Sequence, residues 1–465
     1  MKNRNSSATV IILVIVLVGC SGPVSVTEIQ PTSLPPNVQP SATIKPAPAA
    51  TQGICPPYYS EPEVVFTLHP PTDLQHIVSA DFNDDGWMDI LSVRSHFPTT
   101  ETYEPDILLN DGNRKLILGT SNIFSGAVPL VTFPRELVLA DFNGDGRPDV
   151  FFADSGADVP PQPGYQNTLV LSAPGGKMVD ATANLPQQSS YSHSAAAADI
   201  DADGDIDLYV GNIWSSQTHN LPPQILINEG NASQFTVAKG RLPYPIEDLD
   251  FGAFTTSEFV DVNSDGSPDL ILGDAGDDLA GGKESLVLLN DGRGYFSKLA
   301  NAIPQNQFSM TLALDIDATD LNEDGYQDLI INYTKQEYSG RYIQILINNQ
   351  DGTFRDETST RLPQSDNNSG WIMWIYLIDL NRDGHLDIIA ASLTGANPLF
   401  YLNNGDGSFR SLPNVFHINT SLLFTFIDID RDGFLDVIWT YGGCETGRCP
   451  EEYFLLHSLG CPTLD

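Results

Sequence analysis

Short runs of apolar residues alternate with turn-forming residues along most of this chain, and the runs recur in groups of four. In each group one run precedes an aspartate-rich segment, as at residues 136–140, and a second follows it, as at residues 270–273. A third run ends in an Asn/Gly turn, as at residues 107–112, and an aromatic residue such as Phe354 often begins the fourth. Short runs bounded by Gly, Asn and Asp are typical of β-strands joined by hairpins. The pattern therefore predicts repeated units of four antiparallel strands, with almost no helix.

The aspartate-rich segment is a nine-residue repeat, which reads DFNDDGWMD in its first copy and DFNGDGRPD in its second. Every copy has Asp at positions 1, 5 and 9, Asp or Asn at position 3, and Gly at position 6. Seven copies occur, 49 to 62 residues apart, beginning at Asp81, Asp141, Asp199, Asp261, Asp320, Asp379 and Asp428. Repeats of this period indicate supersecondary units that bury their hydrophobic faces against one another.

The two ends of the chain predict how the units close into a ring. The last unit supplies three strands, the third at residues 453–456, and no fourth follows. A strand-like run without a unit of its own lies near the other end, at residues 63–68. Pairing of this run with the last unit would complete that unit and join the two ends. We therefore expect an all-β fold over residues 55–465: a seven-bladed β-propeller with four antiparallel strands per blade, whose N-terminal strand closes the last blade.

The first residues have the features of an export signal. Lys2 and Arg4 precede an apolar run at residues 8–18, which is too short to span a bilayer and is followed by Gly19 and Cys20. The tetrapeptide Leu-Val-Gly-Cys resembles the lipobox of bacterial lipoproteins. This resemblance implies that a signal peptide of nineteen residues is removed and that Cys20 is lipidated, which would anchor the protein at the cell surface or in the outer membrane or periplasm. The alternative is a plain secretory signal with an unrelated cysteine.

Residues 20–54 differ in composition from the rest of the chain. They are rich in Pro, Ser, Thr and Ala. Such a segment buries too little apolar surface to offset the entropy of ordering it, and its prolines keep it extended. We expect a disordered tether between the anchor and the propeller.

Four cysteines besides Cys20 would lie in an oxidising compartment, where disulfides form. Cys55, Cys444, Cys449 and Cys461 allow three pairings. In the expected propeller, Cys461 follows the third strand of the last blade and Cys55 precedes its fourth, so both stand where a hairpin turn would otherwise be. We expect a Cys55–Cys461 bond that clasps the ring and a local Cys444–Cys449 bond.

The composition adds a strong negative charge. The chain has 22 Lys and Arg against 60 Asp and Glu, a net charge of −38 at pH 7. This charge argues against nucleic acid or an anionic membrane surface as a partner. It is compatible with a well-solvated surface, but the clustering of aspartates in the seven copies favours bound cations.

The repeat supplies the oxygen atoms that calcium prefers. Calcium takes six to eight oxygen ligands at roughly 2.3–2.6 Å. Side chains at positions 1, 3, 5 and 9 and the backbone carbonyl of the variable position 7 can surround one ion, and Gly at position 6 permits the sharp turn. Zinc would favour His or Cys ligands instead. We expect up to seven calcium ions, with these ligands: Asp81, Asn83, Asp85, Trp87, Asp89, Asp141, Asn143, Asp145, Arg147, Asp149, Asp199, Asp201, Asp203, Asp205, Asp207, Asp261, Asn263, Asp265, Ser267, Asp269, Asp320, Asn322, Asp324, Tyr326, Asp328, Asp379, Asn381, Asp383, His385, Asp387, Asp428, Asp430, Asp432, Phe434 and Asp436.

With these loops and this spacing, the chain resembles FG-GAP or VCBS repeat proteins, the propeller units of integrin α-subunits and of many bacterial surface proteins. The resemblance covers roughly residues 63–460 and implies that each DxDxDGxxD loop joins the first two strands of a blade and holds calcium. The "FG" element itself is clear mainly at Phe251 and Gly252. An EF-hand would need a Glu at position 12 and flanking helices. Seven Asx-rich turns without metal are the remaining alternative.

The sequence favours a binding or assembly scaffold over an enzyme. The eight histidines show no metal-ligand spacing, and no GxSxG, HExxH or phosphate-binding glycine loop is present. A polysaccharide lyase or glycosidase on a propeller fold is the alternative, since carboxylate pairs are abundant. The longer loops lie on the face opposite the calcium loops, where a protein or carbohydrate ligand is expected to bind. These loops carry aromatic rings that either contact such a ligand or pack their own loops: Tyr103, Tyr165, Trp214, His219, Tyr333 and Tyr338.

Overall fold

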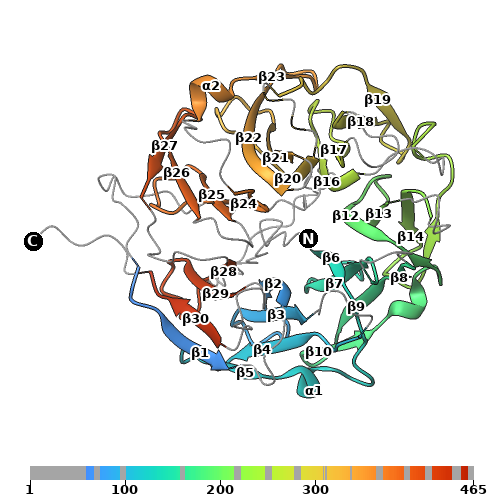
Figure 1. Ribbon diagram of the computed structural model, residues 1–465. Helices are drawn as coiled ribbons and strands as arrows, with labels where there is room; N and C mark the ends of the chain where they lie inside the picture. Colours follow the sequence, from blue (N-terminus) through green and yellow to red (C-terminus); the bar gives the residue numbers. More distant parts are fainter. Residues whose placement is uncertain are drawn as a thin grey trace, which may run out of the picture.

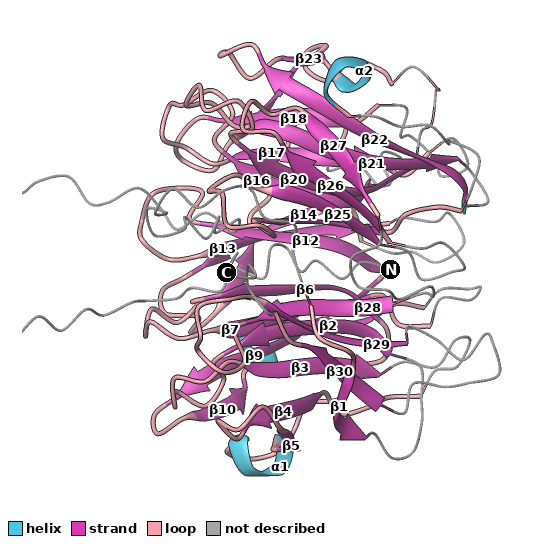
Figure 2. Cartoon of the chain, turned by 90° about the vertical axis from the view of Figure 1, so that its left-hand side faces the viewer, coloured by secondary structure: helices cyan, strands magenta, loops and turns pink. Residues whose placement is uncertain are grey.

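The computed structural model describes residues 59–67, 74–94, 101–157, 163–213, 221–246, 254–276, 284–306, 308, 310, 312–335, 338–362, 370–391, 398–413, 422–441 and 452–458. Within these residues, seven four-stranded antiparallel sheets are arranged radially around a common axis (Figure 1). Figure 2 views the ring from its side and shows strands that cross between its two faces. The predicted seven-bladed propeller is confirmed.

Each blade is a sheet whose first strand lies nearest the axis and whose last strand lies at the rim (Figure 1). Blade 1 contains β2 (Leu74–Ala80), β3 (Asp89–Arg94), β4 (Asp106–Asn110) and β5 (Leu116–Leu118). Blade 2 contains β6 (Pro134–Ala140), β7 (Asp149–Asp154), β9 (Thr168–Ala173) and β10 (Lys177–Asp180). Blade 3 contains β12 (Ser192–Ala198), β13 (Asp207–Asn212), β14 (Gln224–Asn228) and β15 (Phe235–Val237). Blade 4 contains β16 (Phe254–Val260), β17 (Asp269–Asp274), β18 (Leu286–Asn290) and β19 (Phe296–Leu299).

The remaining three blades follow the same plan. Blade 5 contains β20 (Leu312–Thr319), β21 (Asp328–Lys335), β22 (Ser339–Asn348) and β23 (Phe354–Asp356). Blade 6 contains β24 (Trp374–Ile378), β25 (Asp387–Ala391), β26 (Leu399–Asn403) and β27 (Phe409–Leu412). Blade 7 contains β28 (Leu422–Ile427), β29 (Asp436–Tyr441), β30 (Glu452–Leu456) and β1 (Glu63–Thr67).

Few residues outside the blades form regular structure. A two-stranded sheet pairs β8 (Tyr165–Gln166) with β11 (Ser189–Ser190). The helical segments in the described part of the chain include α1 (Thr120–Ile123), α2 (Thr358–Arg361) and a 3₁₀ turn at Thr182–Asn184. Among the described residues, no helix is long and apolar enough to cross a membrane.

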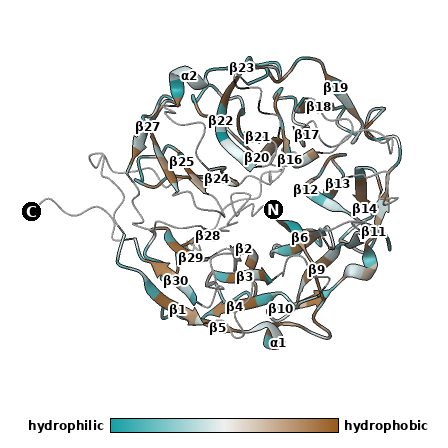
Figure 3. Ribbon diagram, viewed as in Figure 1, coloured by the Kyte–Doolittle hydropathy of each residue, from teal (hydrophilic) through white to brown (hydrophobic). Residues whose placement is uncertain are grey.

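The strands are apolar because each blade is covered on both faces by its neighbours. Hydrophobic residues follow the strands of the ring (Figure 3). The described residues of the first strands are mostly buried but differ in side-chain size: β12 contains four consecutive alanines, Ala195 to Ala198, whereas β24 has Trp374 and Tyr376 and β28 has Phe424 and Phe426. Those four aromatic side chains belong to one core that joins blades 6, 7 and 1. The blades therefore pack directly on one another around the ring, as a repeat fold requires.

The ring closes by pairing of the two ends of the chain. β1 pairs antiparallel with β30, with Glu63 opposite Leu455 and Thr67 opposite Glu452. The pairing continues through a bridge between Tyr59 and Ser458. The N-terminal strand therefore completes blade 7, as the strand count predicts.

Candidate metal-binding loops

The nine-residue repeats form the connections between the first and second strands of the seven blades. We number them loops 1 to 7: residues 81–89, 141–149, 199–207, 261–269, 320–328, 379–387 and 428–436. Because the first strand of every blade runs in the same direction, all seven loops lie on one face of the ring. The apolar position 2 of each loop is buried, which fixes the loop to the blade: Phe82, Phe142, Ile200, Val262, Leu321, Leu380 and Ile429.

Loop 2 shows the local geometry. Asp141 at position 1 accepts hydrogen bonds from the backbone N–H of Asp145 at 3.0 Å and of Gly146 at 2.7 Å, through one oxygen each. Oδ1 of Asn143 at position 3 accepts a second bond from the N–H of Asp145 at 2.9 Å. The chain turns through two left-handed residues, Gly144 at position 4 with φ 73° and Gly146 at position 6 with φ 82°. Gly occupies position 6 in every loop because L side chains rarely adopt this conformation.

Position 9 is the buried end of each loop and the first residue of the second strand. One carboxylate oxygen of Asp149 accepts the N–H of Phe142 in the same loop at 2.8 Å, and the other accepts the N–H of Ser172 on the third strand at 2.6 Å. The same two backbone bonds occur at Asp89, Asp207, Asp269, Asp328, Asp387 and Asp436. Position 9 therefore clamps the loop to the third strand, a role beyond the predicted one of metal ligand.

Burial raises the pKa of every position-9 carboxyl, and for most of them nearby aspartates of the same loop raise it further. The pKa is raised to about 8 for Asp89, Asp207 and Asp387. It is raised to about 7 for Asp149 and Asp269 and to about 6 for Asp328 and Asp436. A cation among these carboxylates would favour their ionised forms.

The donor set of the loops fits a hard cation such as calcium. In loop 3, one carboxylate oxygen from each of Asp199, Asp201 and Asp203 lies within 4.8 Å of the others, and the same holds for Asp428, Asp430 and Asp432 in loop 7. Oδ1 of Asp201 is buried and has no hydrogen-bond partner in the structure. An oxygen in that position can accept a metal ion without losing another bond. The predicted ligands of positions 1, 3 and 5 are thus brought together in these two loops.

Position 3 divides the loops into two groups. Five loops have Asn there, and loops 3 and 7 have Asp201 and Asp430. Each of these two aspartates faces an arginine from outside its loop. Nη2 of Arg241 lies 3.7 Å from Oδ2 of Asp201, and Nη2 of Arg114 on blade 1 donates a hydrogen bond to Oδ2 of Asp430. In these two loops, the additional carboxylate at position 3 therefore lies near the positive charge of an arginine side chain.

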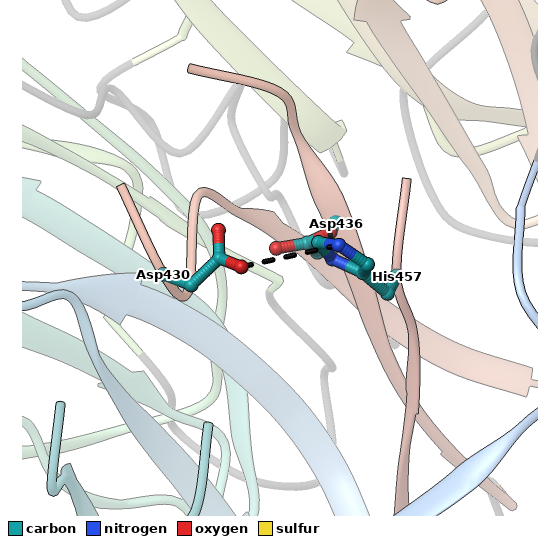
Figure 4. Close-up of side chains that lie close together, drawn as sticks. All are labelled: Asp430, Asp436 and His457. Atoms are coloured by element: carbon teal, nitrogen blue, oxygen red, sulfur yellow. Dashed lines mark hydrogen bonds and ion pairs between the residues drawn. The ribbon is translucent and has the colours of Figure 1, made fainter. Parts of the chain in front are cut away.

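Loop 7 also contains a histidine from beyond the repeat. His457 directly follows β30, and its ring points into the loop between Asp430 and Asp436 (Figure 4). Nδ1 of His457 is 2.7 Å from Oδ1 of Asp436, and Nε2 is 3.9 Å from Oδ2 of both Asp430 and Asp432. Nη2 of Arg114 lies 3.2 Å from the same Nε2. Sequence reasoning treated this histidine as one of eight scattered ones, because the motif itself does not include it.

The side chains of positions 4 and 7 connect consecutive loops. Arg431 at position 4 of loop 7 stacks on Trp87 at position 7 of loop 1, 4.1 Å from the ring centroid. Arg382 in loop 6 stacks in the same way on Phe434 in loop 7, at 4.0 Å. Glu323 in loop 5 lies 3.2 Å from the Nδ1 of His385 in loop 6. The sequence predicts position 7 only as a carbonyl ligand. Complementary residues, such as Arg at position 4 of one copy and an aromatic residue at position 7 of the next, are the sequence feature that indicates these contacts.

Asparagines at the ends of third strands make a second set of contacts between blades. Nδ2 of Asn110 donates to the backbone carbonyl of Ile429 in loop 7 at 2.9 Å. Asn228, Asn290 and Asn348 bond in the same way to position 2 of the preceding loop. The Asn/Gly turns noted in the sequence therefore also hold neighbouring loops in place.

The aromatic residues predicted on the opposite face lie in different environments. Tyr338 is 47% exposed, and its ring centroid is 4.9 Å from that of Trp371. Tyr103 and Tyr165 are half-buried. Tyr333 is not on an exposed loop: it belongs to β21, is buried, and its hydroxyl is 3.1 Å from the hydroxyl of Ser285. Trp214 and His219 lie outside the described residues.

The cysteine predictions also fall outside the part of the chain that the structure describes. This applies to Cys20, Cys55, Cys444, Cys449 and Cys461. The Tyr59–Ser458 bridge is the described pair nearest to Cys55 and Cys461.

Comparison with known proteins gives one family. The model of the FG-GAP-like repeat matches residues 81–152, 141–210, 261–331, 320–390 and 379–439, and each match begins at position 1 of a loop. No match is found among the curated proteins. Among solved structures, a chain of the Photorhabdus luminescens Tc holotoxin pore is similar, with 14% sequence identity and a TM-score of 0.37. That similarity covers 79% of this chain and 18% of the toxin chain, so this chain spans less than a fifth of the toxin chain's length.

Proposed function

Because the chain belongs to the family of FG-GAP-like repeat proteins, we propose that it is a calcium-binding propeller, lipid-anchored outside the cytoplasm, that serves as a binding or assembly scaffold. Its ligand is a protein or a carbohydrate. The propeller fold supports a scaffold or binding role in general, whereas the ion, the anchor and the ligand rest on the observations and experiments below.

Calcium binding is supported above all by the convergence of carboxylates in the loops. Three aspartates of loop 3 approach one another within 4.8 Å, and a buried oxygen of Asp201 among them has no hydrogen-bond donor. Carboxylates at this spacing repel one another strongly in a partly buried site. A bound calcium ion would supply the compensating positive charge and fix the first strand of the blade to the second.

Thermal unfolding tests this proposal. Ions that bind only the folded state raise its stability by about 2.7 kcal/mol per site at a concentration a hundred times the dissociation constant. We expect the melting temperature to rise clearly from excess chelator to millimolar calcium, and to rise less with magnesium, which demands stricter octahedral geometry. A melting curve that is the same in chelator and in calcium would contradict calcium binding.

A ligand site on the face opposite the loops is supported by Tyr338, which is exposed and whose ring contacts that of the partly buried Trp371. Exposed rings on connecting segments suit sugar rings or the side chains of a partner protein. A glycan array would identify a carbohydrate ligand, and Tyr338→Ala should weaken its binding. A reducing-sugar assay on the same glycans distinguishes a binding protein from a polysaccharide-degrading enzyme, since only the enzyme releases new sugar ends.

Lipid anchoring at Cys20 can be tested separately from folding. Cys20→Ser should remove the lipid and release the protein from the membrane fraction, and the propeller should still melt at an unchanged temperature. The reason is that Cys20 precedes the Pro/Ser/Thr-rich segment and not a strand of a blade. Lipid found on the Cys20→Ser protein would exclude Cys20 as the anchor.

A further inference from the structure

Arg114 occupies a hairpin position where the aligned blades have smaller residues. It lies four residues after Asn110, and the equivalent residues are Gly294, Gly352 and Gly407 in blades 4, 5 and 6 and Ala232 in blade 3. All five have positive φ, 64° for Arg114. A side chain longer than glycine is strained in this conformation, so a large residue here calls for an explanation outside the hairpin.

The position faces the loop of the preceding blade. A Cβ atom added at Gly407 would lie 2.6 Å from the backbone carbonyl oxygen of Leu321 in loop 5, and one added at Gly352 would lie 3.1 Å from Val262 in loop 4. For Arg114, the preceding blade around the ring is blade 7. Its side chain accordingly reaches loop 7, although Arg114 and Asp430 are 316 residues apart.

In loop 7 the guanidinium joins two of the groups that a metal ion would use. Nη2 of Arg114 donates to Oδ2 of Asp430 and lies 3.2 Å from Nε2 of His457. Nδ1 of His457 is 2.7 Å from Oδ1 of Asp436 (Figure 4). The ring of His457 therefore lies within hydrogen-bond distance of the Asp436 carboxylate on one side and of the Arg114 guanidinium on the other. The result is one continuous chain of hydrogen bonds from position 3 to position 9.

Loop 3 has the same four aspartates but does not have this arrangement. Arg241 approaches Oδ2 of Asp201 only to 3.7 Å, and Oδ1 has no hydrogen-bond partner in the structure. A divalent ion can therefore share Asp201 with the arginine. In loop 7, a divalent ion would have to displace a hydrogen-bonded guanidinium of the same charge sign and a histidine ring.

We propose that loop 7 is a metal-free latch: Arg114, supported by His457, takes the place of the calcium ion and ties blade 1 to blade 7. The proposal rests on the proposed calcium binding of the other loops. It replaces the expected seven ions by at most six. It also makes the closing seam of the ring independent of the calcium concentration.

Calcium stoichiometry of the full-length protein in detergent tests the latch. Arg114→Gly removes the guanidinium and gives the hairpin the residue found at the same position in blades 4, 5 and 6, so its backbone is accommodated. We expect this variant to bind one more calcium ion than the wild type. Arg293→Ala is the matched control, because Arg293 precedes the aligned Gly294 and pairs with Asp291 of its own hairpin. It should leave the number unchanged.

A double variant locates the additional ion. Asp432→Ala combined with Arg114→Gly should return the stoichiometry to the wild-type number, since Asp432 belongs to loop 7. In excess chelator, Arg114→Gly should melt a few degrees below the wild type because the latch is lost, and calcium should then raise its melting temperature more than that of the wild type.

The possible results separate the latch from the proposed function. Equal and non-zero stoichiometry in the wild type and in Arg114→Gly would overturn the latch and leave calcium binding intact. No calcium in either protein would overturn both. Stoichiometric zinc or nickel bound by the wild type and lost in His457→Ala would also overturn the latch, because a transition metal, and not Arg114, would then occupy the loop.

Discussion

Loops 3 and 7 carry the same aspartates at positions 1, 3, 5 and 9, but their surroundings differ. In loop 3, Asp201 has one oxygen near Arg241 and another, buried, without a hydrogen-bond donor. In loop 7, Asp430 is hydrogen-bonded by Arg114, and His457 fills the space toward position 9. Two loops with one ligand pattern therefore offer a cation different sites.

The difference shows that residues outside the motif change the surroundings of the loop carboxylates. Both arginines come from outside the nine-residue repeat, and Arg114 belongs to a blade at the other end of the sequence. The five loops with Asn at position 3 have one potential charge fewer. In loops 3 and 7, an acidic position 3 coincides with an arginine supplied by the chain outside the loop, which is hydrogen-bonded to the aspartate in loop 7 and 3.7 Å from it in loop 3.

The largest effect is expected from removal of the position-9 clamp in either loop. Asp207→Ala leaves the backbone N–H groups of Ile200 and Asn228 without their acceptor. Asp436→Ala leaves two backbone N–H groups and the His457 ring without theirs. An unsatisfied buried donor costs about 1–3 kcal/mol, so each variant should lose about 3 kcal/mol or more, and Asp436→Ala should lose more than Asp207→Ala.

Thermal or urea unfolding in excess chelator measures this loss without a contribution from bound ions. Asp203→Ala is the control, because it removes an exposed carboxylate of the same loop and should change the stability of the chelated protein little. Equal stability of Asp207→Ala and Asp203→Ala would show that the clamp contributes nothing.

The next largest effect concerns the seam at which loop 7 lies. The described pairing of the ends reaches Tyr59 and Ser458, and the predicted Cys55–Cys461 bond would extend this closure. Removal of a native disulfide typically costs about 2–4 kcal/mol, and a clasp that closes nearly the whole chain should be at the upper end of that range. Cys55→Ser should therefore lower the melting temperature more than Cys444→Ser, whose predicted loop is short. Non-reducing peptide mapping checks the pairing, and a Cys55–Cys444 or Cys55–Cys449 peptide would refute it.

Removal of the aspartate at position 5 should change the number of bound calcium ions in loop 3 but not in loop 7. Asp203→Ala should lower the calcium stoichiometry by one, because Asp203 is one of the three carboxylates that converge in loop 3. Asp432→Ala, the same change in loop 7, should leave the stoichiometry as it is in the wild type. At calcium concentrations near a hundred times the dissociation constant, the lost ion corresponds to about 2.7 kcal/mol of stability. Loss of an ion from both variants would mean that loop 7 is as open as loop 3.

The smallest effect tests the contacts that join loop 7 to loop 1. Arg431→Ala removes the guanidinium that stacks on Trp87. An exposed cation–π contact contributes about 0.5–1 kcal/mol, so urea unfolding should show a loss of that size. Ser264→Ala changes the equivalent position 4 of loop 4, whose side chain is small, and should have no measurable effect. Equal unfolding curves for the two variants would show that the stacking of Arg431 on Trp87 does not stabilise the contact between blades 7 and 1.

Much of the fold follows from the sequence, since each blade is encoded by a local pattern. The repeat places every loop between two strands, and the count of strands assigns residues 63–68 to blade 7, where β1 is found. The clamp at position 9 was not foreseen, because an aspartate that binds metal and one that binds backbone amides look the same in a motif.

The contacts of loop 7 were beyond sequence reasoning for a different reason. A repeat pattern contains only the residues that its copies share. Arg114 and His457 are not among them, and the contacts of loop 7 depend on these two residues. They meet only when the ring closes, across 343 residues of sequence. The spacing of the motif contains no information about which exceptional residues face one another in space.

The placement of β1 in blade 7 also restricts how such a chain can change in length and order. In an open repeat array, a unit can be added at either end, provided that capping units cover the exposed faces. Here β1 and β28 to β30 complete one sheet, and the backbone N–H of His457 donates a hydrogen bond to Oγ of Ser60, 397 residues away in the sequence. The ring of blades therefore has no free end at which a further blade could be added. A duplicated blade would have to be inserted between two existing blades, and the angle between every pair of neighbouring blades would then change. A circular permutant cut between two whole blades would leave each sheet contiguous but would lose the strand that fastens the ring.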